Sequence, residues 1–205
     1  MSAVEMREEA GDRSGMKRLG LARLIVADLR AKAEWVYGAV TRKTLLKTLL
    51  TDGTFAMIMY RLMQCAQRLR LAPLVMLFNK LNIFFGRCII GRNAQFGPGF
   101  VLVHSYGVVI NTNVRGGANI KVEHLVTIGA ERNASPVLGN NVFIGAGAKI
   151  VGGVHIGNNV RVGANAVVVD DVPDGATVVG IPARVVRVHG KKPEGQSEAG
   201  AEGKQ

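Results

Sequence analysis

A short aliphatic residue recurs at every sixth position through the second half of the chain. The repeat is unbroken over six positions, which are Leu138, Ile144, Ile150, Ile156, Val162 and Val168. The fifth place of each repeat also holds a small or β-branched residue. A period of six fits neither an α-helix nor a simple alternating strand. It is typical of a hexapeptide parallel β-helix, in which three hexads form a triangular coil and the aliphatic residue points inward.

The same register can be followed toward the amino terminus with two interruptions. Its earlier members are Ile90, Phe96, Leu102, Ile110, Gly116, Val122 and Ile128, with two extra residues inserted after the hexad that Leu102 begins. A second insertion, residues 129–137, contains Ser135 and Pro136 and suits a loop that protrudes from a coil. We therefore expect a coiled domain over residues 87–188, with about five coils and a continuous core.

The first part of the chain has a helical pattern, and we expect a helical domain over residues 19–86. Leu19–Trp35 is amphipathic, Phe55–Leu71 is more apolar, and Pro73 begins a further apolar segment. Charged residues interrupt each segment before it reaches about 18 apolar residues, so no transmembrane helix is expected. Residues 1–18 lack the apolar core of a secretory signal, and these residues and the polar tail 189–205 are expected to be disordered.

The formal net charge of +11 favours anionic ligands. No basic stripe interleaved with aromatic residues is visible, so we expect no nucleic-acid partner. Phe84 and Phe85 crowd near Lys80 and Arg87, which leaves peripheral contact with an anionic membrane surface as an open alternative. The two cysteines suit buried positions in a reducing compartment, and we expect a cytoplasmic protein.

Two histidines occupy the same place in hexads one coil apart. His104 and His124 are each third in their hexad, so they should lie on adjacent rungs about 4.8 Å apart. The next residues of that column are Ala146 and Ala164. Imidazoles can transfer protons near neutral pH, and the alanines would leave a shallow track for an extended ligand. The alternative is that both histidines merely cap turns of the coil.

The segment from Ile90 to Arg187 resembles the catalytic domain of serine acetyltransferases and of their relatives in polysaccharide gene clusters. The matching stretches are GFVLVHSYGVVI, VEHLVTIG, VFIGAGAKIVGGVHIG and GIPARVV. The resemblance implies an α+β protein, in which an N-terminal helical region precedes a left-handed parallel β-helix of hexapeptide repeats. It also implies an O-acetyltransferase that uses acetyl-CoA, no metal, and a small hydroxyl acceptor, serine or a sugar. The implied assembly is a homotrimer with active sites between subunits, or a hexamer of two trimers.

The resemblance assigns roles to several residues. His104 matches the family's catalytic histidine, which would act as general base. His124 could orient His104, hold the acceptor or protonate the departing thiolate. The donor would lie along the coils past Gly129, Ala146 and Ala164. The candidates for binding its phosphates are Lys149, Arg161 and Arg184.

The chain departs from the family pattern at three places. The family's Asp before the catalytic histidine is Val103 here, its partner Asp one coil earlier falls at about Ile89, and its loop histidine aligns with Ser135. Glu123 and Glu131 are candidate substitutes for the missing carboxylates, and the alternative is that each is simply an exposed surface residue. Since these changes remove groups associated with serine, a sugar acceptor competes closely with it. Docking on cysteine synthase is not expected, because the chain ends in Gln rather than Ile.

Two other classes of function remain open on this fold. A metal-dependent hydratase needs three histidines that converge across a subunit boundary, whereas the column supplies only His104 and His124. A noncatalytic scaffold would need neither histidine. Metal analysis and a measurement of acetyl-CoA binding separate both classes from an acetyltransferase.

Overall fold

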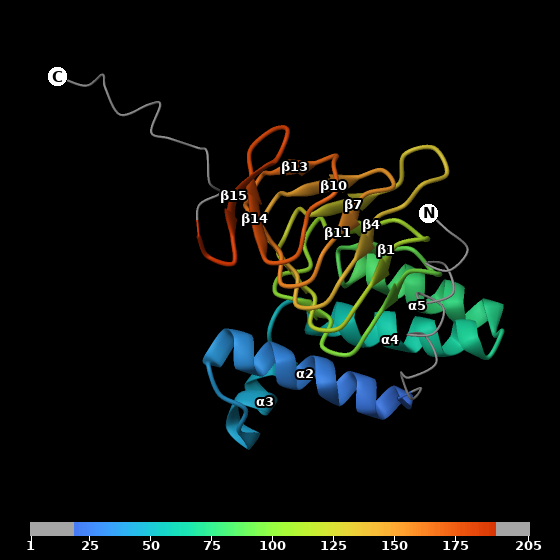
Figure 1. Ribbon diagram of the computed structural model, residues 1–205. Coiled ribbons are helices and arrows are strands. Elements are labelled where there is room, and N and C mark those ends of the chain that lie inside the picture. Colours follow the sequence, from blue (N-terminus) through green and yellow to red (C-terminus); the bar gives the residue numbers. More distant parts are fainter. Residues whose placement is uncertain (1–18, 192–205) are drawn as a thin grey trace, which may run out of the picture.

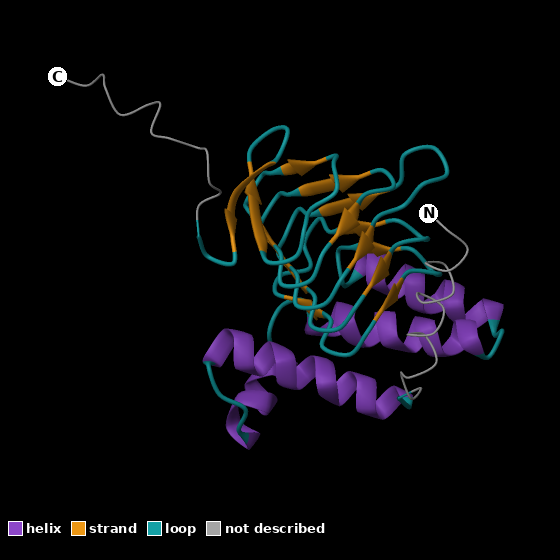
Figure 2. Cartoon of the chain, in the orientation of Figure 1, coloured by secondary structure: helices purple, strands orange, loops and turns teal. Residues whose placement is uncertain are grey.

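The computed structural model describes residues 19–191 and consists of helices followed by a parallel β-solenoid (Figures 1 and 2). The predicted order of a helical region and a hexapeptide-repeat coil is confirmed. The disorder predicted for residues 1–18 and 192–205 falls outside the described residues. Residues 189–191 are described, and a short bridge pairs Lys191 with Val188.

Four helices lie within the described residues. They are α2 (Leu21–Tyr37), α3 (Arg42–Leu49), α4 (Thr54–Arg68) and α5 (Ala72–Phe84). The sequence pattern anticipated α2, α4 and α5 but not α3, which begins at a capping box between Thr41 and Thr44. Within residues 19–191 no helix combines the length and the apolar character that crossing a membrane requires.

The strands form three parallel sheets that are the faces of a triangular coil. The first sheet contains β1 (Ile89–Ile90), β4 (Val109–Ile110), β7 (Thr127–Gly129), β10 (Lys149–Val151) and β13 (Val167–Val168). The second contains β2 (Gln95–Phe96), β5 (Arg115–Gly116), β8 (Val137–Leu138) and β11 (His155–Ile156). The third contains β3 (Val101–Leu102), β6 (Lys121–Val122), β9 (Phe143–Ile144), β12 (Arg161–Val162), β14 (Ala176–Val179) and β15 (Arg184–Val188).

The solenoid has about four turns rather than the five expected from the sequence. Strands β1 to β12 supply three strands to each of four turns, and β13 and β14 begin another. The chain then reverses, and β15 pairs antiparallel with β14. The inward register is confirmed, since all six aliphatic residues of the unbroken repeat are at most 3% exposed. Gly116 supplies no side chain to this core, and the ring of Phe96 from the turn before lies where its Cβ would be.

The first turn of the solenoid has no preceding turn to pair with, and buried side chains of the helices cover its open end. Asp28 of α2 accepts hydrogen bonds from the backbone N–H groups of Gly99 and Phe100, both at 2.9 Å. Arg61 of α4 donates to the carbonyl oxygens of Phe96 and Gly97 at 2.9 and 2.6 Å. These bonds satisfy backbone groups that would otherwise be buried without partners.

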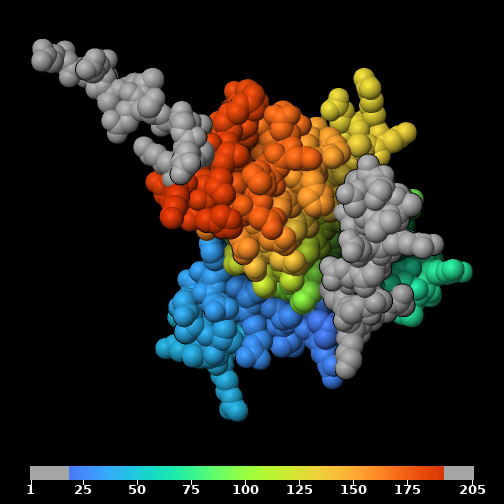
Figure 3. Space-filling model, in the orientation of Figure 1, coloured from blue at the N-terminus to red at the C-terminus, as the bar shows by residue number. Residues whose placement is uncertain are grey.

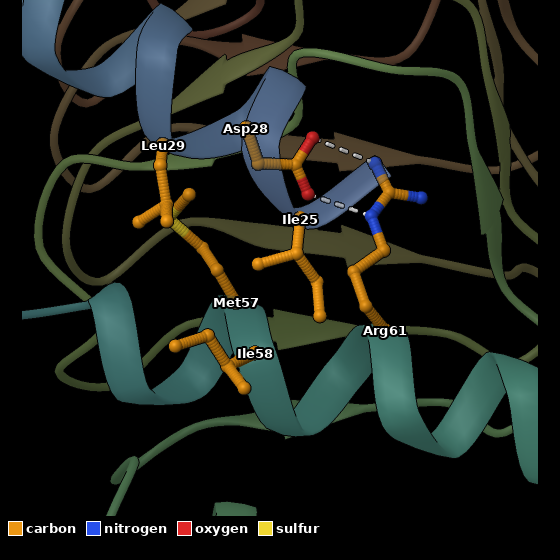
Figure 4. Close-up of a pocket in the computed structure, with 6 residues that line it drawn as sticks. All are labelled: Ile25, Asp28, Leu29, Met57, Ile58 and Arg61. Atoms are coloured by element: carbon orange, nitrogen blue, oxygen red, sulfur yellow. Dashed lines mark hydrogen bonds and ion pairs between the residues drawn. The ribbon is translucent and has the colours of Figure 1, made fainter. Parts of the chain in front are cut away.

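Asp28 and Arg61 also form an ion pair with each other (Figure 4). Nε and Nη2 of Arg61 lie 2.6 and 2.9 Å from the two carboxylate oxygens of Asp28. Burial raises the pKa of Asp28, and the bonds from Arg61, Phe100 and Gly99 oppose that rise. The pair therefore joins α2, α4 and the first turn in one buried network.

Three further polar side chains extend this cover. The hydroxyl of Tyr60 donates to the carbonyl of Ala94 and accepts from the N–H of Phe96, both at 3.1 Å. Asn79 of α5 donates to the carbonyl of Ile90 at 3.2 Å. Lys32 of α2 donates to the carbonyl of Leu102 at 2.9 Å. The helical region is thus the cap of the solenoid, attached through hydrogen bonds as well as apolar contacts.

Residues 130–136 of the insertion form a loop that projects from the coil between β7 and β8 (Figures 1 and 3). A small antiparallel bridge between Glu131 and Ala134 closes it. Glu131, Arg132, Asn133 and Ala134 are exposed, as expected for a protruding loop, and Pro136 returns the chain to the core.

We predict that Arg61→Met destabilises the protein strongly. The substitution leaves Asp28 buried without its partner, and breaking a buried pair in this way costs about 3–5 kcal/mol. The matched control is Arg184→Met, because Arg184 forms an exposed pair with Asp170 at 3.2 Å and such pairs contribute about 0–1 kcal/mol. Urea unfolding measures both variants, and equal losses for the two would contradict the capping role of Arg61.

Candidate functional site

The register of the third sheet places the two histidines and the two alanines in one column. Leu102, Val122, Ile144 and Val162 pair in consecutive turns, and each column residue lies two positions beyond one of them. The column is therefore His104, His124, Ala146 and Ala164, as the hexad count predicted. The imidazole centroids of the two histidines lie 5.9 Å apart, with their planes at 75°.

A carboxylate from the helical region completes the arrangement at His104. Oδ2 of Asp52, in the loop between α3 and α4, lies 3.2 Å from Nδ1 of His104. The hydroxyl of Ser105 donates to the other oxygen of Asp52 at 3.3 Å. The side chains of Asp52 and His104 are each 55% exposed, so the pair is open to an incoming molecule. The sequence analysis did not identify Asp52.

The two carboxylates that the sequence suggested as substitutes lie elsewhere. Oε2 of Glu123 is 3.8 Å from Nδ1 of His124 and so faces the second histidine. Glu131 is an exposed residue of the inserted loop. Neither carboxylate lies at His104, where the helical cap instead supplies a carboxylate through Asp52.

Gly53 explains how the loop can bring Asp52 so close to the coil. Its φ of +78° is in the left-handed region, and a Cβ at this position would lie 2.5 Å from the carbonyl oxygen of Leu102. Only a glycine permits both the turn and this approach. An Asp-Gly pair between two helices is a turn signal in the sequence, but the signal does not tell which part of the fold the turn faces.

Asp52 is in a setting that favours its charged form. Burial raises its pKa, but hydrogen bonds from the His104 side chain, the Gly53 N–H, and the hydroxyl and N–H of Ser105 together hold the pKa below its usual range. A carboxylate with such bonds stays ionised at neutral pH. His104 therefore faces a negative charge on its Nδ1 side.

The residues expected to contact the donor are only partly brought together. Ala146 and Ala164 follow the histidines, and Nζ of Lys149 donates to the carbonyl of Leu125 at 2.7 Å, next to His124. Gly129 lies outside the column, at the end of β7.

The two arginines proposed for the donor phosphates have other contacts in this structure. Nη1 of Arg184 is 3.2 Å from a carboxylate oxygen of Asp170, and it also donates to the carbonyl of Ala183. The guanidinium of Arg161 lies 4.7 Å from the ring centroid of Phe143, on the outer surface of the third sheet. Both arginines are exposed.

The arrangement can accept a proton at His104 and can receive an extended ligand along the small residues of the column. In the part of the chain that the structure describes, no three side chains of His, Cys, Asp or Glu come together as a metal site would require. A hexapeptide-repeat solenoid with a carboxylate–histidine pair at the head of such a column defines a protein of the hexapeptide acyltransferase class.

Comparison with known proteins identifies the family. The family model "Bacterial transferase hexapeptide (six repeats)" matches residues 135–170. The serine acetyltransferase of Helicobacter pylori strain J99 is 33% identical over 142 residues, which cover 67% of this chain and 83% of that protein. The chain belongs to the serine acetyltransferase-like family of hexapeptide-repeat acetyltransferases.

Two further relatives bear on the ligands. The protein assigned as the colanic acid biosynthesis acetyltransferase WcaB of Escherichia coli K12 is 43% identical over 117 residues, 56% of this chain and 72% of that protein. The structure of the serine acetyltransferase of Brucella abortus strain S19 in complex with coenzyme A superposes with a TM-score of 0.73 at 25% identity. The match covers 80% of this chain and 67% of that chain.

We predict that Ala164→Trp blocks acetyl-CoA binding without unfolding the protein. A large ring in the column would occupy the space expected for the donor, whereas the core depends on the inward neighbours Val162 and Val168. The matched control is His155→Trp, which adds a ring on an exposed position of the second sheet. Calorimetric titration with acetyl-CoA and a thermal melt measure both variants. Unchanged affinity in folded Ala164→Trp would place the donor on another face.

Proposed function

We propose that this chain transfers an acetyl group from acetyl-CoA to a hydroxyl group of a small acceptor, with His104 as general base. The observation that carries the proposal is the 3.2 Å contact between Nδ1 of His104 and Asp52. It supports a histidine whose ring is oriented by a carboxylate and whose other nitrogen, Nε2, is available to the acceptor. The family to which the chain belongs supports the same reaction.

The path of the proton during the reaction follows from this orientation. With its proton on Nδ1 donated to Asp52, neutral His104 accepts the acceptor's hydroxyl proton at Nε2 as the hydroxyl oxygen attacks the thioester carbonyl. The carbon–sulfur bond breaks as the tetrahedral intermediate collapses, and the imidazolium returns the proton to the thiolate of coenzyme A. The ionised Asp52 stabilises the imidazolium while it exists. A positioned general base contributes about 10²–10⁴-fold in rate.

His124 lies on the donor side of His104 in this proposal. It belongs to the next turn of the solenoid, between His104 and the alanines of the column, and its ring meets His104 edge-on. That place supports a role in holding the thioester, while His104 returns the proton to the thiolate. Its Nδ1 faces Oε2 of Glu123, so Nε2 is the nitrogen that would contact the donor.

A sugar hydroxyl is the second candidate acceptor beside serine. The positions where the family carries groups associated with serine hold Val103 and Ser135 here. The similarity to a protein assigned to colanic acid biosynthesis supports the same alternative. Both candidates use the same base and the same donor, so a single assay separates them.

We predict that His104→Ala loses about 10²–10⁴-fold in the rate of acetyl transfer while it remains folded. The residue lies on the coil surface, outside the inward register, so its removal should leave the core intact. The assay measures thiol release from acetyl-CoA with serine and with a panel of sugars. His155→Ala, at an exposed position outside the column, is the control. A His104→Ala variant with most of the wild-type activity would identify another base.

We also propose that the protein is a homotrimer built through the solenoid. The column forms one open wall, and the first sheet beside it exposes Ile89 by 48% and Val109 by 38%. Phe84 and Phe85, which precede β1 in the sequence, are 73% and 71% exposed. A neighbouring subunit that covers these residues would supply the other wall of the site.

The trimer is tested by light scattering coupled to gel filtration. We expect a mass of three chains, or of six if the helical caps pair two trimers. Ile89→Asp should shift the protein toward smaller species, because it places a charge in the proposed interface. A monomer across micromolar concentrations would contradict the assembly.

A further inference from the structure

Lys32 occupies an unusual place for a lysine, because it lies in the middle of α2 and is fully buried. Its ammonium donates a hydrogen bond to the carbonyl oxygen of Leu102 at 2.9 Å. It donates a second one to the carbonyl oxygen of Asp52. Both acceptors are backbone carbonyls, so the ammonium links two segments of main chain.

Those two segments carry the two members of the pair at the site. Leu102 ends β3, two residues before His104, and β3 is the edge strand of the third sheet. Asp52 lies 52 residues before His104 in the loop that precedes α4. The direct contact between the loop and His104 is made by two side chains that are each half exposed. Lys32 ties the same two segments together from the buried side.

We propose that Lys32 is a positioning residue, which holds the backbone of Asp52 against β3 so that the carboxylate stays on Nδ1 of His104. The claim rests on the proposed function, since it concerns the geometry of the proposed base. Lys32 reaches neither the acceptor nor the donor, because its side chain is enclosed between α2, the Asp52 loop and β3.

The energetics of burial support this role over one of simple packing. Placing an ammonium in the interior is unfavourable, and a well-packed apolar residue of similar length is often at least as stable. Burial lowers the pKa of Lys32 to about 8, while the negative charge of Asp52 opposes that shift. A methionine could fill the volume, but it could not hold either carbonyl.

Loss of this attachment should lower the rate of acetyl transfer strongly, because proton transfer depends on short distances. A displacement of about 1 Å at a catalytic group can reduce the rate by about 10²-fold. Without Lys32, the Asp52 loop keeps the turn at Gly53 but loses its buried attachment to Leu102. His104 would then sample ring orientations that do not direct Nε2 toward the acceptor.

A double-mutant cycle tests the proposal through kcat. Lys32→Met should lower kcat by about 10–100-fold, with little change in the KM for acetyl-CoA, because the donor column is part of the solenoid. If Lys32 acts through Asp52, the double variant Lys32→Met/Asp52→Asn should lose no more than Asp52→Asn alone. Losses that multiply, or an unchanged kcat in Lys32→Met, would overturn the proposal.

Two control variants separate positioning from folding. Lys43→Met removes an exposed lysine of α3 and should leave kcat unchanged. Lys32→Arg retains a cationic donor and should keep more activity than Lys32→Met, whereas a purely apolar packing role predicts the opposite order. Thermal melts show whether each variant is folded at the assay temperature. If Lys32→Met does not fold, Lys32→Arg and Lys32→Gln are compared instead. A higher kcat for Lys32→Arg, which keeps a cationic donor, supports the proposal, and the reverse order would overturn it.

Nuclear magnetic resonance of ¹⁵N-labelled histidine gives a readout that does not depend on turnover. The signal of His104 is assigned by its absence in His104→Gln. In the wild type we expect the tautomer with its proton on Nδ1, and in Lys32→Met a mixture of the two tautomers. An unchanged tautomer would refute the positioning role even if the protein transferred no acetyl group to any acceptor. Absence of transfer by the wild type would instead refute the proposed function alone.

Discussion

The open end of the solenoid is the constraint on which the rest of this structure depends. Every later turn pairs its backbone with the turn before it, but the first turn has no such neighbour. An uncovered edge of this kind exposes unpaired N–H and C=O groups, and proteins cover such edges or blunt them. Here α2, α4 and α5 cover it with buried polar side chains, among them Asp28, Arg61 and Lys32. The helices therefore act as the terminal cap that a repeat structure needs.

The same cap brings a charged group to the head of the column. Because α2 and α4 are fixed on the first turn, the loop between α3 and α4 reaches the corner where His104 lies. Gly53 permits the close approach, and Asp52 then faces Nδ1 of His104. The rest of the column depends on the stacking of the solenoid alone. The site thus has two structural sources, the coil for the histidines and alanines, and the cap for the carboxylate.

This division explains what the sequence could predict. The hexad period predicted the inward register and the column of His104, His124, Ala146 and Ala164. In a parallel solenoid, residues at the same place of hexads one turn apart lie above one another, so the repeat in sequence gives their positions in space. Asp52 could not be found in this way, since its place depends on how helices dock on a coil 52 residues away. The available signals were indirect: an Asp-Gly turn between two helices, and Ile89 at the position of the family's carboxylate. The sequence analysis did not single out Lys32, because its partners are backbone carbonyls of Asp52 and Leu102, which no sequence pattern reveals.

The measurement that tests this account most directly is a double-mutant cycle between the carboxylate and the proposed base. The rate of acetyl transfer is compared for the wild type, Asp52→Asn, His104→Ala and the double variant, and light scattering at the assay concentration shows whether all four form the same assembly. The account predicts a loss of roughly a hundredfold or more for Asp52→Asn, as the ring of His104 loses its acceptor, and no further loss when Asp52→Asn is added to His104→Ala. A rate for Asp52→Asn equal to that of the wild type would contradict it.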